Sequence, residues 1–290
     1  MKINSWNVRG INASDKRKRI KRLVDDMKSD IVLLQETKLS QESYEKTLFK
    51  WSKWSSFHSP SIGASGGLAV LWNPLLIQGQ LIHQHQNWQM VQISNFEISF
   101  LIINVYGPNS TQDKLKIWDA LTQKIQSQQT QLIILGGDFN AVLNQNEKIG
   151  GISPPLRTIE DFTNFVDNNG LMDIPPSQGM YTWSNRRDGF AQIAVRLDRF
   201  LLSQEWKLQH FQITSDILPY PESDHYPITL SLTKAANINH YQGKSSFKFE
   251  RMWLRHPHFL QHLKQWWVSA PFVPGSKMYQ FAMKMKHIKK

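Results

Sequence analysis

The stretch SDHYPITLSL, residues 223–232, places an acid–imidazole pair directly before a predicted β-strand. Asp224 and His225 are followed within two residues by a proline and then by alternating apolar residues, the pattern of a half-buried strand. An aspartate beside a histidine is common in loops, so the pair alone identifies no site. Its meaning depends on whether other predicted strands end in matching polar residues.

Short apolar runs and apolar–polar alternation recur along the first 233 residues and predict further strands. The segments are KINSWNV (2–8), DIVLLQE (30–36), GLAVLW (67–72), MVQIS (90–94), ISFLIINVYG (98–107), QLIILGGDFN (131–140), YTWSN (181–185), RLDRFLLS (196–203) and YPITLSL (226–232). Helical patterns lie at residues 15–28, 41–50, 111–128 and 158–169. The mixture predicts an α/β fold in which two mixed β-sheets pack together with helices outside.

Five of the predicted strands begin or end in polar residues. Strand tips at one edge of a two-sheet sandwich converge, so residues far apart in the sequence can share one pocket. The residues concerned are Asn7, Glu36, Asp138, Asn140, Asp198, Asp224 and His225. Each alone has an ordinary explanation as a helix cap or turn former, and Asp198 can instead pair with Arg196 or Arg199. Their joint occurrence favours a single site.

Together these side chains suit the hydrolysis of a phosphodiester. Water attacks phosphorus and the transition state gains negative charge, so the site needs a metal ion, a proton acceptor and hydrogen-bond donors. Glu36 offers Mg²⁺ a hard oxygen. Asn7 and Asn140 can orient a phosphate or a ligand without adding charge, and Asp198 can fix the imidazole of His225.

The net charge of +11 is concentrated at the C-terminal end of the chain. Residues 234–290 contain 11 lysines and arginines against one acidic residue, whereas residues 1–233 contain 23 against 22. We therefore expect a folded domain at 1–233 and a basic, aromatic-rich segment at 234–290. The basic run KRKRIKR at 16–22 opens a predicted helix. We expect it to form a solvated helix face and not an edge that contacts phosphate.

The chain contains no cysteine, which excludes disulfides, thiolate metal sites and cysteine nucleophiles. No apolar run approaches the roughly 18 residues that cross a bilayer, and the N-terminus lacks the pattern of a signal peptide. We expect a protein of the nucleus or cytoplasm that is not secreted and has no membrane partner.

The order of seven motifs resembles that of the endonuclease/exonuclease/phosphatase superfamily, which includes exonuclease III, the apurinic endonucleases and DNase I. The motifs are WNVRG, LLQET, NVYGP, GGDFN, YTWSN, RLDRFLLS and SDHYPITL, and they span residues 1–233. The subtype resembles the endonuclease domain of plant LINE-type (non-LTR) retroelements. The resemblance implies a four-layered, DNase I-like α/β sandwich and Mg²⁺-dependent cleavage of DNA that leaves a 3′-hydroxyl.

The resemblance also implies a metal site. Glu36 is then the metal ligand, with Asn7 beside it and Asp224 supporting the metal side. Mg²⁺ is the expected ion, and Mn²⁺ can substitute for it.

The phosphate and proton-transfer groups follow in the same way from the resemblance. Tyr106 and Asn140 contact the phosphate, while Asp198 and His225 form an acid–imidazole pair. Asp138 positions or deprotonates the attacking water. The general base remains open between Asp138 and His225.

Two positions depart from the pattern of apurinic endonucleases. Those enzymes carry an aspartate near the metal where this chain has Arg9, and a bulky aromatic residue beside the abasic-site pocket where it has Val195. Both departures argue against repair of abasic sites and leave nicking of intact DNA open. Arg9 would either lower the local metal affinity or reach a phosphate.

The segment YTWSNRRDG, residues 181–189, matches a hairpin region of the family. Thr182 and Trp183 lie in the match, and we expect them to contact DNA. Arg186 and Arg187 suit either the DNA backbone or a solvated turn.

Three functions compete. The first is an endonuclease that nicks DNA for target-primed reverse transcription, with the reverse transcriptase absent from this chain. The second is a phosphatase of the same fold acting on another substrate. The third is a decayed retroelement remnant that binds DNA without cutting it, although every expected catalytic position is filled.

The segment 234–290 resembles the link between endonuclease and reverse transcriptase in plant LINE proteins. Its many large apolar groups suit a missing partner or a helix folded back onto the sandwich. They include Phe247, Phe249, Trp253, Phe259, Trp266 and Trp267. The sequence does not predict an oligomeric state.

Overall fold

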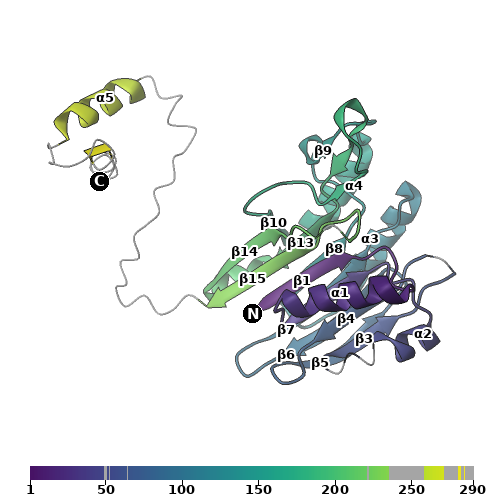
Figure 1. The fold of residues 1–290 in the computed structure, drawn as a ribbon. Helices are drawn as coiled ribbons and strands as arrows, with labels where there is room; N and C mark the ends of the chain where they lie inside the picture. The colour runs from purple at the N-terminus through teal and green to yellow at the C-terminus, as the bar shows by residue number, and fades with distance from the viewer. Residues whose placement is uncertain are drawn as a thin grey trace. The chain divides into compact units, whose positions relative to one another are not determined.

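Two six-stranded β-sheets form the centre of the N-terminal unit, Met1–Ala235 (Figure 1). The computed structural model describes residues 1–48, 51, 53–63, 65–220, 222–234, 258–270, 280–281 and 284. The first sheet has the order β14 (Phe211–Ile217), β15 (Ile228–Lys234), β1 (Lys2–Asn7), β2 (Ile31–Gln35), β4 (Leu68–Trp72) and β3 (Ser55–Ser59). The second has the order β10 (Leu171–Ile174), β13 (Asp198–Ser203), β8 (Ile133–Asp138), β7 (Ser99–Tyr106), β6 (Trp88–Ser94) and β5 (Gln78–Gln84).

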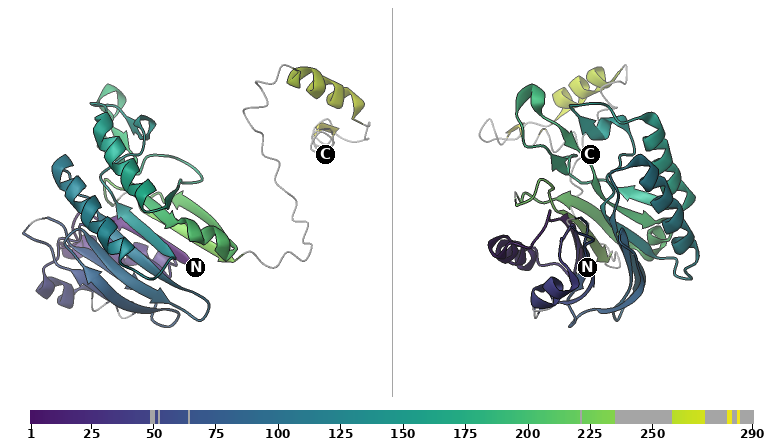
Figure 2. Two further views of the ribbon diagram at one scale, coloured as in Figure 1. Left: turned by 180° about the vertical axis from the view of Figure 1, so that it is seen from behind. Right: turned by 90° about the vertical axis from the view of Figure 1, so that its right-hand side faces the viewer.

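Each sheet contains one parallel pair, β1–β2 in the first and β7–β8 in the second, and antiparallel pairs elsewhere. Helices α1 (Ser14–Asp26) and α2 (Gln41–Lys46) lie on one outer side, and α3 (Thr111–Gln126) and α4 (Leu156–Asn168) lie on the other (Figure 2). The predicted four-layered sandwich of two mixed sheets flanked by helices is confirmed.

Three apolar layers hold these four layers together. The central layer lies between the sheets and includes Leu33, Ile134 and Phe200. A second layer packs the first sheet against α1 and α2, and a third packs the second sheet against α3 and α4. Strands buried on both faces are apolar at most positions, which explains why β4 is a continuous apolar run in the sequence and β2 is one up to Gln35.

The four strands of these sheets that the sequence analysis missed are the four sheet edges: β3, β14, β5 and β10. An edge strand pairs on one side only and often exposes one face, so it needs no continuous apolar run. In β5, half-buried positions alternate with exposed ones along QGQLIHQ. A third sheet of short strands, β11 (Trp183–Ser184), β12 (Ala194–Val195) and β9 (Lys148–Ile149), was predicted only in part, through the segment 181–185.

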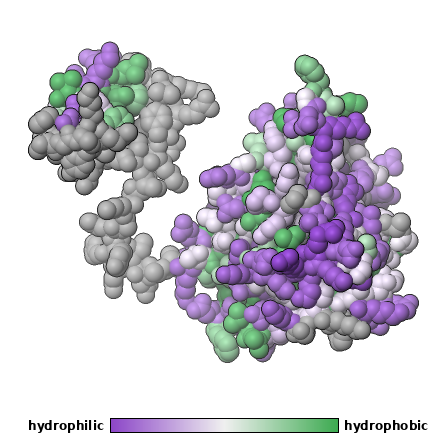
Figure 3. All heavy atoms as spheres, in the orientation of Figure 1, coloured by the Kyte–Doolittle hydropathy of each residue, from purple (hydrophilic) through white to green (hydrophobic). Residues whose placement is uncertain are grey.

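The four predicted helices of this unit are present with shifted ends, and the predicted end of α2, at residues 49 and 50, lies outside the described residues. α3 buries Ile117, Trp118, Leu121 and Ile125, the spacing of one helix face. α1 buries only Ile20 and Val24, while the basic residues of its run 16–22 are exposed or half-buried. Figure 3 shows hydrophilic side chains covering the side of the unit on which α1 lies.

The second unit, Ala236–Lys290, contains α5 (Phe259–Ser269). Phe259, Trp266 and Trp267 lie on this helix, and the remaining predicted aromatic residues of the segment, Phe247, Phe249 and Trp253, lie outside the described residues. Among the described helices, none combines the length and the apolar character needed to cross a bilayer.

Candidate active site

Strand register brings three of the predicted site residues together on the second sheet. Asp138 ends β8, and it lies opposite Asp198, the first residue of antiparallel β13. On the other side of β8, Asp138 lies beside Tyr106, which ends parallel β7. On the first sheet, Asn7 ends β1 beside Gln35, which ends parallel β2. Parallel strands end at the same sheet edge, so both sheets present their polar tips there.

The chain turns sharply after each of these strands. The side-chain oxygen of Asn7 accepts a hydrogen bond from the backbone N–H of Arg9 (3.0 Å), and that of Asp138 accepts one from the N–H of Asn140 (2.9 Å). Arg9, Glu36 and Asn140 each adopt the left-handed conformation with φ of 48°. Such backbone is uncommon for residues other than glycine and concentrates at functional sites.

The glycine pair before Asp138 allows two close approaches at the site, of Gly137 to the neighbouring strand β7 and of Gly136 to the other sheet. A Cβ atom on Gly137, whose φ is 155°, would lie 1.9 Å from the carbonyl oxygen of Val105. A Cβ atom on Gly136 would lie 2.7 Å from the Cδ1 atom of Leu33, across the central layer. Any larger residue at either position would therefore displace the strand that carries Asp138.

Asn7 links the two sheets within the site. Its side-chain nitrogen donates to Glu36 Oε1 (3.0 Å) and to Asp138 Oδ2 (2.9 Å). All three side chains are almost fully buried. The second carboxylate oxygen of Glu36, Oε2, lies 3.5 Å from the ammonium group of Lys38, a cation that the sequence analysis did not assign to the site.

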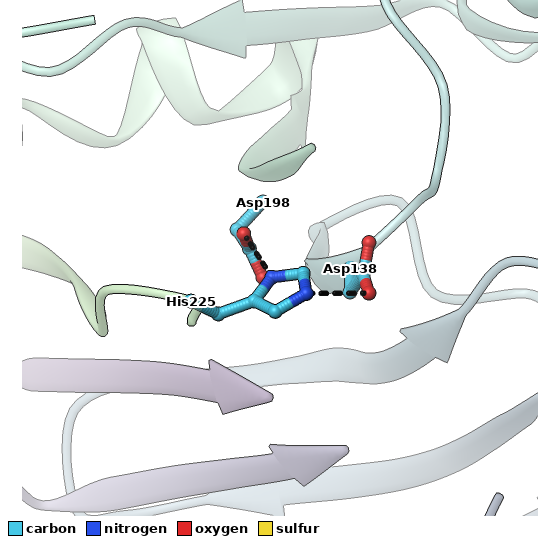
Figure 4. A group of neighbouring side chains, drawn as sticks. All are labelled: Asp138, Asp198 and His225. Carbon is cyan, nitrogen blue, oxygen red and sulfur yellow. Dashed lines mark hydrogen bonds and ion pairs between the residues drawn. The ribbon is translucent and has the colours of Figure 1, made fainter. Parts of the chain in front are cut away.

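His225 lies between two aspartates that come from other segments of the chain (Figure 4). Its Nδ1 atom is 2.9 Å from Asp198 Oδ2, and its Nε2 atom is 3.7 Å from Asp138 Oδ2. The hydroxyl of Thr182 accepts hydrogen bonds from the backbone N–H groups of Leu197 and Asp198, which fixes the start of β13. The imidazole is therefore oriented from one side and faces Asp138 with the other.

Burial and charge set the protonation of this group. Burial raises the pKa of Asp138 to about 6, and the nearby Asp198 adds to the rise. Burial lowers the pKa of His225, but the charges of Asp198 and Asp138 outweigh it and raise the pKa to about 9. Between these values Asp138 is a carboxylate and His225 is an imidazolium.

Asp224 lies beside this group but is engaged elsewhere. Its carboxylate accepts hydrogen bonds from Arg9 Nε (3.0 Å), Arg9 Nη2 (2.9 Å) and Trp183 Nε1 (2.9 Å). Burial alone would raise the pKa of Asp224, but the donors on Arg9 and Trp183 lower it to about 2. Arg9 Nη1 also lies 3.3 Å from Glu36 Oε1, so Arg9 bridges the carboxylates of Asp224 and Glu36. In the sequence, Arg9 stood out only because apurinic endonucleases carry an aspartate at this position.

Tyr106 and Asn140 lie beside Asp138, on either side of the strand end. Burial, and then the carboxylates of Glu36 and Asp138, raise the pKa of Tyr106, so its hydroxyl remains a donor. The side-chain nitrogen of Asn140 donates to the carbonyl of Gly107 (2.7 Å). Lys114, which the sequence analysis also missed, donates to the Asn140 carbonyl (2.5 Å).

Two hollows flank these residues. One, of about 490 Å³, is lined by Tyr106, Asn87, Gly67 and Lys116 among others. The other, of about 370 Å³, is lined by Asn140, Lys114, Lys148 and Val195 among others.

The four residues expected to contact DNA have different surroundings. Thr182 is buried, and its hydroxyl accepts a hydrogen bond from the backbone N–H of Asp198, so it positions the start of β13. Trp183 is half-buried and donates to Asp224. Arg186 donates to the Ser223 carbonyl, and both Arg186 and Arg187 are exposed in the loop between β11 and β12.

The alternative in which Asp198 pairs with a neighbouring arginine is wrong. Arg196 binds Asp173 (2.6 Å) and Glu147 (2.9 Å), and Arg199 binds Glu147 (2.8 Å). Glu147 and both arginines are almost fully buried. This ion-pair network ties the second sheet to the short turn Gln145–Glu147 before β9 and leaves Asp198 to His225.

The sequence of this chain matches the family model described as Endonuclease/Exonuclease/phosphatase family over residues 5–225. The chain belongs to the endonuclease/exonuclease/phosphatase family. Its members are phosphoester hydrolases, and the chain is an enzyme of this hydrolytic class. Both His225 and Asn7 lie inside the matched range.

Known members of the family share its sequence and fold at moderate similarity. An exodeoxyribonuclease of Bacillus subtilis (strain 168) is 26% identical over 255 residues, covering 79% of this chain and 98% of the relative. The AP endonuclease LMAP from Leishmania major superposes with a TM-score of 0.66 at 14% identity, covering 81% and 88% of the two chains. The 3′ phosphatase NExo from Neisseria, bound to product DNA hairpin, has a TM-score of 0.61 at 21% identity, covering 80% and 99%. These superpositions show a common fold.

The acidic groups of this family member fit a hard divalent cation. Mg²⁺ and Mn²⁺ prefer carboxylate and amide oxygens, which Glu36, Asp138 and Asn7 supply. Asp138, Asp198 and His225 have ligand atoms within 4.8 Å of one another, but Asp198 and His225 already bind each other. Glu36 is therefore the better holder of a metal ion, because its carboxylate lies beside Asn7 and its ion pairs with Arg9 (3.3 Å) and Lys38 (3.5 Å) are long.

Proposed function

We propose that this protein is a divalent-metal-dependent DNA endonuclease that nicks its target and leaves a 3′-hydroxyl. One observation carries the proposal: Asn7 joins the carboxylates of Glu36 and Asp138, and Asp138 in turn faces the imidazole held by Asp198. This edge thus combines a metal-binding carboxylate, a proton acceptor and a fixed cation, the groups that phosphodiester hydrolysis requires.

Asp138 is the proposed general base. Its carboxylate takes a proton from the attacking water as the water oxygen forms its bond to phosphorus. His225, as the imidazolium, stabilises the charge that develops on the phosphorane, and Asp198 keeps it protonated and oriented. A divalent ion held by Glu36 and Asn7 would supply Lewis-acid stabilisation of the same charge. The P–O3′ bond then breaks and the departing O3′ takes a proton from solvent water, leaving a 5′-phosphate and a 3′-hydroxyl.

Tyr106 and Asn140 orient the scissile phosphate in this proposal. The raised pKa of Tyr106 keeps its hydroxyl as a donor at neutral pH. Asn140 has a fixed backbone conformation and a neutral side chain, so it can hold a phosphate oxygen without changing the charge of Asp138.

DNA is the proposed substrate because cations and an apolar tip surround the site. Lys114 and Lys148 line one hollow, and Lys116 lines the other. Arg187 and the fully exposed ring of Phe190 lie in the loop between β11 and β12. Arginines bind phosphates, and exposed aromatic rings can wedge between base steps. The relative from Neisseria described above was solved with product DNA.

The biological setting is also a proposal. The motif order that resembles plant LINE elements supports nicking of chromosomal DNA for target-primed reverse transcription, in the nucleus. The segment 234–290 would then lead to a reverse transcriptase domain in full-length relatives. Its positive charge suits general attraction to nucleic acid through counterion release.

Nicking of supercoiled plasmid tests the proposal. With Mg²⁺ or Mn²⁺ we expect conversion to nicked circles whose 3′ ends a DNA polymerase extends directly, and we expect EDTA to abolish the reaction. An abasic duplex should be cut little faster than an intact one, because Val195 lines the hollow beside Asn140 where an aromatic wall would be needed. Release of phosphate from a 3′-phosphorylated oligonucleotide without nicking would favour the phosphatase instead, and binding without either reaction would favour an inactive remnant.

A further inference from the structure

Arg9 lies between two carboxylates at the exposed side of the active site. Its Nε and Nη2 atoms form a fork on Asp224, at 3.0 Å and 2.9 Å, and its Nη1 atom lies 3.3 Å from Glu36 Oε1. A guanidinium is charged at every relevant pH, and its planar fork matches a carboxylate. The carboxylates of Asp224 and Glu36 therefore share one permanently charged group, the guanidinium of Arg9.

The backbone holds this cation in place. Arg9 has a φ of 48°, and its N–H donates to the side-chain oxygen of Asn7, the residue that links Glu36 and Asp138. The carbonyl of Arg9 accepts a hydrogen bond from the ammonium of Lys16 (3.1 Å). Arg9 is therefore positioned by the active-site framework, although its side chain remains 42% exposed.

The protein's own donors satisfy the carboxylate of Asp224. A carboxylate offers about four acceptor positions. On Asp224 they are used by two nitrogens of Arg9, by Trp183 Nε1 (2.9 Å) and by the Ser223 hydroxyl (3.3 Å). Glu36 differs, because its ion pairs with Arg9 Nη1 (3.3 Å) and the Lys38 ammonium (3.5 Å) are longer than the 2.9 Å pair between Asp224 and Arg9 Nη2.

We propose that Arg9 is a built-in cation of the active site that prevents Asp224 from binding metal and limits the site to one divalent ion, held on the Glu36 side. Arg9 is thereby a positioning residue that sets metal stoichiometry. The inference rests on the metal-dependent nuclease proposed above and deepens it. It replaces the expectation from sequence that Asp224 supports the metal.

Titration of the full chain with Mn²⁺, followed by electron paramagnetic resonance of the free ion, tests this directly and without a substrate. We expect one site in the parent protein and its loss in Glu36→Gln. In Arg9→Gln the carboxylate of Asp224 becomes available, so we expect a second site or an affinity at least about tenfold tighter. Arg19→Gln is the matched control, because Arg19 pairs with Glu222 on the surface and its loss changes the net charge equally.

The double variant Arg9→Gln/Asp224→Asn shows whether the Asp224 carboxylate causes the additional or tighter Mn²⁺ binding. If the gain comes from the freed Asp224 carboxylate, the double variant returns to one site with an affinity within about threefold of the parent. If Arg9→Gln does not fold, Arg9→Lys serves the same purpose, because one ammonium cannot form the fork on Asp224 and should also tighten Mn²⁺ binding.

Three outcomes overturn the inference: two sites in the parent protein, no change in the Arg9 variant, or a gain that persists in the double variant. A parent protein that binds no Mn²⁺ at all would instead refute the metal dependence of the proposed function. A parent that binds one Mn²⁺ through Glu36 with no effect of Arg9 refutes this inference alone.

Discussion

Replacing Asp198 by asparagine should abolish most activity at pH 8 and leave more of it at lower pH. Asp198 Oδ2 lies 2.9 Å from His225 Nδ1, and both side chains are almost fully buried. Asparagine keeps the size of the side chain and removes its charge. The imidazolium then loses the nearest of the acids that stabilise it.

The size of the effect follows from the charge removed. Two unit charges about 4 Å apart interact by about 4 kcal/mol at an effective dielectric constant of about 20. Since one pKa unit corresponds to about 1.4 kcal/mol, the pKa of His225 should fall by about 3 units, from about 9. At pH 8 the protonated fraction would then fall about 100-fold, and so would the nicking rate if the imidazolium is the active form.

Single-turnover nicking of supercoiled plasmid from pH 5 to pH 9.5, at saturating divalent ion, measures this change. The parent should show a bell-shaped profile, because Asp138 must be ionised and its pKa is about 6, while His225 must be protonated and its pKa is about 9. In Asp198→Asn the alkaline limb should move to lower pH. Asp119→Asn, an exposed residue of α3, is the control for loss of one negative charge.

An unchanged alkaline limb in Asp198→Asn would refute the electrostatic role of this aspartate. A rate at pH 8 that rises in the variant would show that neutral His225 is the active form. His225, and not Asp138, would then be the general base.

Three further predictions concern other parts of the chain. Glu36→Gln should abolish both Mn²⁺ binding and nicking, which Mn²⁺ titration and the plasmid assay check. Glu147→Gln should lower the free energy of unfolding by about 3 kcal/mol in urea titrations, because it breaks buried pairs with Arg196 and Arg199. Burial opposes the charged form of Glu147, but these arginines outweigh it and lower the pKa of Glu147 in the folded protein. The difference in unfolding free energy between parent and variant should therefore shrink as pH falls through the acid range. Arg187→Ala should reduce the slope of log affinity against log salt for DNA by about 0.9, the value for one phosphate contact, and an unchanged slope would place Arg187 away from the backbone.

The buried inner strands were readable from sequence because burial on both faces forces nearly every position to be apolar. This holds for β4, for β2 up to Gln35, and for β7 apart from Asn104, whose side chain accepts a hydrogen bond from Gln35. The edge strands β3, β5, β10 and β14 escaped for the converse reason, since pairing on one side only leaves room for polar residues. The helices were found by their spacing, with ends displaced by a few residues because local caps and packing set the boundaries.

For the site, the sequence by itself determined which side chains stand at strand tips. The strand patterns before or after them place five polar residues there: Asn7, Glu36, Asp138, Asp198 and His225. Only the tertiary structure decided which of these side chains meet. Asp198 had two neighbouring arginines as candidate partners, yet those arginines turn to Glu147 and Asp173, which come from distant segments.

The same holds for Arg9, whose partners Glu36 and Asp224 are 27 and 215 residues away along the chain. A side chain's rotamer is chosen by the charges and volumes around it, and those arrive from other strands only when the sheets close. The sequence therefore predicts which residues stand at the strand tips, because that depends on local patterns. Pairing, protonation and the choice of metal ligand are properties of the closed sandwich.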